Sequence, residues 1–142
     1  MNDALKQAKL ALQRDEVPIG AVIVKDGKVI ARGYNNRQKS QIATNHAEII
    51  AINKACKKLK SWRLDGCDIY VTLEPCPMCA GAIANARLSR LFYACKETSS
   101  QDNLCEHILT SNRLNHKVEI IFDDQMEKVC QNMLSNYFKK KR

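Results

Sequence analysis

The stretch Asp68-Ile69-Tyr70-Val71-Thr72-Leu73-Glu74-Pro75-Cys76-Pro77-Met78-Cys79 changes its character half-way along. Residues 68–73 form a short apolar run rich in β-branched and aromatic side chains, which predicts a buried strand. Pro77 suits the first position of a helix, because its missing N–H costs nothing there. We therefore expect a strand that passes into a helix ending near Ala86, with two cysteines at the start of that helix.

The rest of the chain continues this alternation of helices and strands. We expect helices at 2–14, 46–58, 77–86 and about 104–109, a last helix capped by Asp123-Asp124, and strands at 21–24, 29–31, 68–73, 91–95 and 118–122. The Asp26-Gly27 pair predicts a hairpin turn, and the polar segment 35–44 is interpreted as a loop. This order predicts one α/β domain over residues 1–142, with three α/β/α layers around a central five-stranded mixed sheet.

Composition and cysteine content limit the class of protein. Hydrophobic residues make up 45% of the chain, and no apolar run is long enough to predict a membrane-spanning helix. The start of the chain lacks the pattern of a secretory signal, so we expect a cytoplasmic protein. Seven cysteines is an odd number, which argues against a secreted disulfide framework. Five of them are expected to be reduced, buried thiols: Cys56, Cys67, Cys95, Cys105 and Cys130.

The chain is strongly basic. Its net charge is +8 and its pI is about 9.2, which favours a polyanionic partner. The C-terminus joins one aromatic residue to four cations: Phe138, Lys139, Lys140, Lys141 and Arg142. A second basic cluster consists of Lys54, Lys57, Lys58, Lys60 and Arg63. Neither cluster need contact a polyanion: the second could be a solvated helix face, and the tail could be a frayed end.

Three side chains have the pattern of a zinc site. Cys76 and Cys79 are separated by two residues, so both sulfur atoms can reach one ion from a single helical turn, and His46 would supply a third ligand. Three protein ligands leave one coordination position free, which is typical of catalytic zinc. Zinc lowers the pKa of bound water from about 15.7 to about 7. A redox pair or half of a structural zinc site is the alternative for the two cysteines alone.

Glu48, two residues after His46, has the properties of a proton carrier. It would take a proton from water and deliver it to a ring nitrogen and to departing ammonia, if partial desolvation raises its pKa. Alternatively, Asn45 and Glu48 could form a helix capping box. Positions i and i+2 do not face each other on a regular helix, so His46 is expected at the very start of the helix. His-x-Glu followed by Pro-Cys-x-x-Cys is the signature of zinc-dependent nucleobase deaminases.

Over nearly its whole length, the chain resembles the bacterial tRNA-specific adenosine deaminases of the cytidine deaminase superfamily. The matching segments are Glu16–Val22, His46–Ile49, Tyr70–Ala82, Asn115–Glu119 and Met133–Arg142. The resemblance implies a CMP/dCMP-type zinc deaminase domain with a cytidine deaminase-like fold. It also implies hydrolytic conversion of adenosine to inosine at the wobble position of the anticodon, in tRNA for arginine.

The resemblance also implies roles for particular residues. His46, Cys76 and Cys79 would hold one zinc ion per subunit, and Glu48 would carry the proton. Asn35 would contact the base, with a simple turn residue as the alternative, and Val17 and Ala47 would form pocket walls. The tail would contact the tRNA anticodon loop, Phe138 by stacking on unpaired bases and its four cations by meeting phosphates. The family is homodimeric, with an RNA site built partly from the second subunit.

Some positions depart from the family pattern. Lys96 falls on a position that the family uses near the substrate ribose, within the atypical segment Cys95–Asp102. Tyr93-Ala94-Cys95 and Leu64–Cys67 look somewhat like the guanine deaminases of the same superfamily. Two alternatives to the tRNA enzyme follow: a deaminase of a free nucleobase such as guanine or cytosine, and a non-catalytic zinc-containing RNA-binding module.

Overall fold

A five-stranded mixed sheet forms the centre of the protein in the computed structural model, which describes residues 1–98 and 102–142. The strands are β1 (Gly20–Lys25), β2 (Lys28–Tyr34), β3 (Cys67–Val71), β4 (Arg90–Tyr93) and β5 (Glu119–Phe122), in the spatial order β2-β1-β3-β4-β5. Strand β1 is antiparallel to β2 and β3, whereas β3, β4 and β5 are parallel. The predicted mixed sheet is confirmed.

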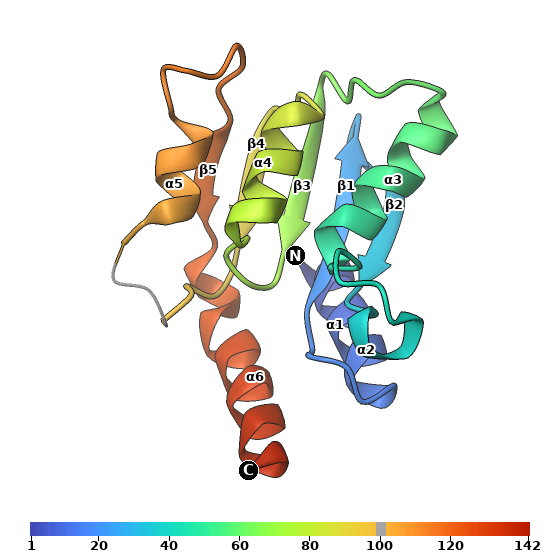
Figure 1. The fold of residues 1–142 in the computed structure, drawn as a ribbon, viewed down its shortest axis with the longest axis vertical. Coiled ribbons are helices and arrows are strands. Elements are labelled where there is room, and N and C mark those ends of the chain that lie inside the picture. Colours follow the sequence, from blue (N-terminus) through green and yellow to red (C-terminus); the bar gives the residue numbers. More distant parts are fainter. Residues whose placement is uncertain (99–101) are drawn as a thin grey trace.

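Helices cover both faces of this sheet. They are α1 (Asn2–Gln13), α2 (Arg37–Ser40), α3 (Ala47–Leu59), α4 (Pro77–Asn85), α5 (Leu104–Leu109) and α6 (Glu127–Lys141), with a short 3₁₀ turn η1 (Asp124–Met126) before α6. Helices α3 and α4 lie side by side on one face and α1 lies on the other, while α6 extends away from the end of the sheet (Figure 1). The predicted three layers are therefore present.

Two glycines allow helices to approach the sheet closely. A Cβ on Gly20 would collide with the backbone of α1 at Ala4 and Ala8. A Cβ on Gly33 would collide with the Ala47 carbonyl oxygen and lie 2.8 Å from the Ala51 nitrogen in α3. Because Gly33 pairs with Ala21, the residue after Gly20, the two glycines point to opposite faces of the sheet. The sheet thus positions α3, the helix that follows His46, by direct backbone contact.

The main core lies between the sheet and the helices α3, α4 and α5. Its fully buried side chains include Ile69, Leu91, Ile83, Leu88 and Leu109. Burying each such side chain contributes about 1.5–3 kcal/mol. A second, smaller cluster joins α1 to α6 and the end of β4 through Leu5, Cys95, Cys130 and Leu134. The C-terminal helix is therefore packed onto the body of the protein.

The hairpin turn has the predicted geometry. Asp26 and Gly27 have φ angles of 51° and 74°, and Lys25 pairs with Lys28 across them. Two residues with positive φ define the type I′ turn, which matches the twist of the flanking strands. The Asp-Gly pair therefore identified the turn correctly.

Three sequence predictions differ in part from the structure. The segment 35–44, interpreted as a loop, contains the single helical turn α2. Asp123 caps the turn η1, by accepting a hydrogen bond from the Gln125 N–H at 3.3 Å, and the α-helix begins only at Glu127. The cysteine prediction holds for four thiols, which are buried, whereas Cys56 is half-buried; all five are free.

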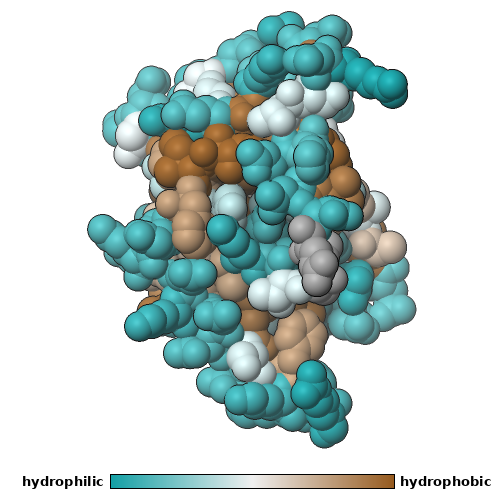
Figure 2. All heavy atoms as spheres, turned by 90° about the vertical axis from the view of Figure 1, so that its left-hand side faces the viewer, coloured by the Kyte–Doolittle hydropathy of each residue, from teal (hydrophilic) through white to brown (hydrophobic). Residues whose placement is uncertain are grey.

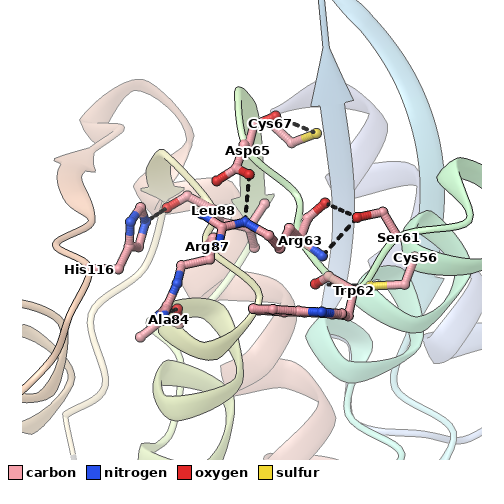
Figure 3. A network of polar contacts seen from close by, with 10 residues as sticks. All are labelled: Cys56, Ser61, Trp62, Arg63, Asp65, Cys67, Ala84, Arg87, Leu88 and His116. Carbon is pink, nitrogen blue, oxygen red and sulfur yellow. Dashed lines mark hydrogen bonds and ion pairs between the residues drawn. The ribbon is translucent and has the colours of Figure 1, made fainter.

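The loop between α3 and β3 lies at the end of the sheet opposite to the start of α3 (Figure 1), and local polar contacts hold it (Figure 3). Arg63 pairs with Asp65 at 2.9 Å, and the Ser61 hydroxyl contacts Arg63 backbone atoms. The Trp62 side chain is 60% exposed, with the Arg63 guanidinium 5.4 Å from its ring centre. A 13-residue helix is about 20 Å long, so this loop is remote from the residues at the start of α3.

Hydrophilic side chains cover most of the surface on the side of α5 and β5, with hydrophobic atoms showing in separate patches (Figure 2). Among the described residues, no helix is long and apolar enough to cross a membrane.

Candidate metal centre and active site

Two helix starts meet at the carboxyl end of the parallel strands. His46 is the residue before α3 and Cys76 the residue before α4, and both have extended backbone angles, with ψ of 155° and 169°. Cys79 follows in the first turn of α4. The carboxyl ends of the strands are the usual place for binding sites in open α/β sheets. The expectation that His46 lies at the very start of its helix is confirmed.

The three predicted ligand atoms are close together. His46 Nδ1 lies 3.6 Å from the sulfur atoms of both Cys76 and Cys79, and all three atoms are within 4.8 Å of one another. In a tetrahedral site with Zn–S bonds of about 2.3 Å and Zn–N bonds of about 2.05 Å, nitrogen and sulfur lie about 3.6 Å apart. The three side chains therefore fit a single metal ion.

The charges of the cluster also favour a cation. A hydrogen bond from Cys79, together with one from His46, lowers the pKa of Cys76 to about 4. The same hydrogen bond between the two sulfur atoms, with burial, raises the pKa of Cys79. The hydrogen bond to Cys76 raises the pKa of His46. Thiolate is the form of cysteine that binds metal ions, and Cys76 adopts it readily.

Glu48 is buried beside this cluster. Its side chain is only 4% exposed, and burial raises the pKa of its carboxyl to about 7. A group with this pKa can both accept and donate a proton near neutral pH.

The capping box considered for Glu48 is not formed. The N-cap of α3 is His46 and not Asn45. The Asn45 backbone N–H donates to the Ile42 carbonyl oxygen at 3.1 Å, and its side-chain amide donates to the Ser40 hydroxyl at 3.0 Å. The carboxylate of Glu48 is thus left for another role.

A pocket of about 800 Å³ opens over these residues. Its lining includes His46, Glu48 and Cys76, together with Val17. Three more lining residues come from the end of the chain: Phe138, Lys139 and Arg142. The fold therefore brings His46 and Cys76, which precede Phe138 by 92 and 62 residues, to one cavity with the basic tail.

The remaining predicted residues lie outside the pocket lining. Ala47 is fully buried against Gly33, and Cys79 is buried behind Cys76. Asn35 is 5% exposed, and its side-chain amide nitrogen lies 3.4 Å from the Glu16 carboxylate. Lys140 and Lys141 do not line the large pocket, although Lys141 lines a smaller neighbouring one.

The end of α6 is docked and not frayed. Lys141 Nζ lies 2.7 Å from the Asp15 carboxylate and 5.6 Å from the ring centre of Tyr137. The Tyr137 hydroxyl donates to the Asp15 carbonyl oxygen at 3.3 Å. These contacts tie the tail to the turn that carries Val17, one of the pocket-lining residues.

Sequence reasoning missed part of this site. Polar residues of α6 also line the pocket: Gln131, Asn132 and Ser135. Residues 131, 135, 138 and 142 are three or four positions apart and so lie on one face of the helix, and this spacing could have identified the polar lining residues. Lys96, which the family resemblance had placed near the substrate, also lines the pocket, with its Nζ 5.0 Å from the ring centre of Phe122. Residues 99–101 of the atypical segment lie outside the part of the chain that the structure describes.

The fold and the His/Cys/Cys cluster beside a buried glutamate define the deaminase class. The sequence profile of the MafB19-like deaminases matches residues 1–142, and the chain belongs to this family. It is 43% identical over 143 residues to the tRNA-specific adenosine deaminase of Bacillus subtilis, covering all of this chain and 88% of that protein.

Solved structures show the same relationship. A structure from a study of A-to-I editing by tRNA deaminases at the wobble position superimposes with a TM-score of 0.80 and 42% identity, over 87% of this chain and 95% of that one. A guanine deaminase from Bacillus subtilis superimposes with a TM-score of 0.65 and 47% identity, over 68% of this chain and 62% of that one.

Proposed function

We propose that this protein is a tRNA adenosine deaminase, a hydrolase that converts adenosine to inosine at the wobble position of the anticodon in tRNA for arginine. The observation that carries the proposal is the single pocket in which a metal-binding cluster and a buried glutamate lie beside the basic, aromatic end of α6. The full-length similarity to a tRNA-specific adenosine deaminase supports this choice of substrate.

The cofactor in this proposal is one zinc ion per subunit, held by His46, Cys76 and Cys79. When bound, zinc makes hydroxide available near neutral pH by lowering the pKa of water to about 7. The donor set of one imidazole and two thiolates suits zinc, which prefers nitrogen and sulfur ligands. Three ligands leave one position open for the reaction.

Glu48 carries the protons of the reaction. It takes a proton from the attacking water as the oxygen bonds to C6 of adenine, and delivers a proton to the ring nitrogen N1. The second proton comes from the new hydroxyl group on C6 and protonates the amino group. The C6–N bond then breaks as the C6–oxygen double bond forms, and ammonia leaves with inosine as the product. Burial supports this cycle, because it raises the pKa of Glu48 to about 7, which allows both directions of transfer.

The RNA contacts in this proposal come from the pocket wall and from α6. Val17 and Ala47 shape the wall, and Asn35 contacts the base. Phe138, 48% exposed, offers a face for stacking an unpaired base of the anticodon loop, and Lys139 and Arg142 lie beside it to meet phosphates. The target base must leave its loop to enter the pocket, which costs little for an unpaired base. An enzyme acting on tRNA is expected in the cytoplasm.

We also propose that the protein is a homodimer. The outer face of α4 supports this, because Met78 is 37% exposed and a Cβ on Gly81 would meet nothing within 4 Å. Gly81→Arg should therefore leave the fold intact and abolish association, as measured by light scattering after size exclusion. An unchanged dimer would place the interface elsewhere, and a monomeric wild type would contradict the proposal.

A purified anticodon stem-loop with adenosine at the wobble position tests the proposed reaction. The zinc-loaded protein should form inosine, while the same stem-loop with guanosine or cytidine there stays unchanged. Absence of inosine from zinc-loaded, folded protein would refute the proposal.

Deamination of free guanine is the second candidate, favoured by the similarity to the guanine deaminase of Bacillus subtilis. It needs no basic tail. Turnover of free guanine that survives deletion of residues 139–142, without inosine formation in RNA, would favour this candidate.

A further inference from the structure

Glu16 is a fully buried carboxylate at the turn that follows α1. Three N–H donors surround it. Its Oε1 accepts the Lys39 backbone N–H at 2.7 Å, and its Oε2 accepts the Gln38 backbone N–H at 3.1 Å and the Asn35 side-chain amide at 3.4 Å. A buried charge is tolerated when such donors satisfy it. Glu16 therefore connects the turn after α1 to the segment from Asn35 to Lys39.

This carboxylate determines which way the Asn35 amide faces. An ionised carboxylate can only accept hydrogen bonds, so the amide nitrogen of Asn35 must turn toward Glu16 and the amide oxygen away from it. Among the described residues, this oxygen, Oδ1, has no hydrogen-bond partner. Every fully buried polar side-chain atom of these residues does have a partner. Oδ1 is thus not fully buried, and it keeps its capacity to accept a hydrogen bond from a bound molecule.

The position of Asn35 connects it to the pocket wall. Its backbone N–H donates to the Ile19 carbonyl oxygen at 3.0 Å, and the Asn36 N–H donates to the Asn45 carbonyl oxygen at 3.0 Å. Ile19 lines the pocket, and Asn45 directly precedes the pocket-lining His46. Asn35 therefore lies between two parts of the wall, with its orientation decided by Glu16 behind it.

We propose that Glu16 is a positioning residue for substrate recognition: it holds the Asn35 amide with its oxygen outward, as an acceptor for an N–H or O–H donor of the substrate nucleoside. This inference rests on the proposed function, in which Asn35 contacts the substrate. Glu16 itself touches no reacting atom and acts through Asn35.

The variant Glu16→Gln tests this orientation. A glutamine places an NH₂ group among donors, so the Asn35 amide should turn over and present its nitrogen outward. We expect kcat/KM for the adenosine stem-loop to fall about tenfold to a hundredfold, mainly through a higher KM, with metal content unchanged. Asp68→Asn is the matched control, because Asp68 is a buried carboxylate paired with Arg90 on another part of the sheet. It should leave KM unchanged.

A double-mutant cycle separates positioning from general stabilisation. If Glu16 acts through Asn35, then Glu16→Gln should cost nothing further in the Asn35→Ala background. If the fold losses in kcat/KM of the two single variants multiply in the double variant, the inference is overturned. Should Glu16→Gln fail to fold, Glu16→Asp replaces it: this variant keeps an acceptor-only group and should retain more activity than Asn35→Ala. Lower activity than Asn35→Ala at an unchanged Tm would contradict the inference.

The wild-type assay separates this inference from the proposed function. If the wild type forms no inosine, the proposed function fails. If the wild type is active and the two substitutions act independently, only the role of Glu16 fails.

Discussion

Two residues with extended backbones determine the geometry of the metal-binding cluster. His46 and Cys76 each directly precede a helix, which frees their side chains from the regular spacing of helical positions. This is why His46 and Glu48, two residues apart, both face the pocket. The signature of His-x-Glu followed by Pro-Cys-x-x-Cys predicted this cluster. Spacing alone gives no reason for His46 to lie near Cys76, since 30 residues separate them.

Replacing Glu48 by glutamine tests its role at this scale. Among the described residues Glu48 forms no ion pair, and glutamine keeps its shape, so the variant should keep its stability and the cluster should still bind metal. We expect inosine formation to fall at least about 10²-fold, with zinc content and Tm retained. Inosine formation close to the wild-type rate would contradict the proton-carrying role of Glu48. The exposed Glu106→Gln variant serves as the control.

Replacing Cys76 by alanine should abolish metal binding. The variant removes a ligand, so zinc content measured by atomic spectroscopy should fall to background and activity should be lost with it. Cys105→Ala is the matched control, because this buried thiol packs in the core. Its removal should lower the free energy of unfolding by about 1–2 kcal/mol without loss of zinc. Full zinc content in the Cys76 variant would contradict the assigned ligands.

At the scale of elements, close backbone packing places the start of α3 against the sheet. The periodicity of apolar residues predicted most helices and strands, because their buried faces follow the period of the element. It could not predict α2, since this single turn depends on the carboxylate of Glu16, some 20 residues earlier in the chain. A short polar segment has no periodicity of its own from which such a turn can be recognised.

Alanine at two glycines should separate the roles of α1 and α3. Gly33→Ala should displace α3 and with it His46 and Glu48, so both stability and activity should fall. Gly20→Ala should displace α1, with a similar loss of stability but a smaller loss of activity per folded molecule. We expect each substitution to lower the free energy of unfolding, measured by chemical denaturation, by about 1–3 kcal/mol. Equal specific activity of the two folded variants would contradict this distinction.

At the scale of the whole molecule, the docked α6 brings cations to the pocket. The sequence showed the excess of positive charge and its concentration at the C-terminus. It could not show that Lys141 is paired with Asp15 while Lys139 and Arg142 line the pocket, because this depends on where the helix packs. The four cations of the tail are therefore not equivalent.

Arg142→Ala should weaken binding of the stem-loop and reduce its salt dependence. Loss of one phosphate contact to single-stranded RNA should lower the slope of log K against log salt by about 0.7. Lys28→Ala, at the hairpin turn remote from the pocket, should leave the slope unchanged. Fluorescence anisotropy at several salt concentrations measures both; equal slopes for Arg142→Ala and wild type would exclude a phosphate contact.

Residue types and apolar periodicity were enough to predict the candidate chemistry and most of the elements of this protein. Residue type decides what binds a metal or moves a proton, and periodicity decides which short segments can bury a face. Which residues share a site depends instead on packing in three dimensions. Packing docks α6 on the turn at Asp15, brings its cations into one pocket with the His/Cys/Cys cluster, and joins Glu16 to Asn35. These contacts join residues far apart in the chain, and packing, not local pattern, brings them together.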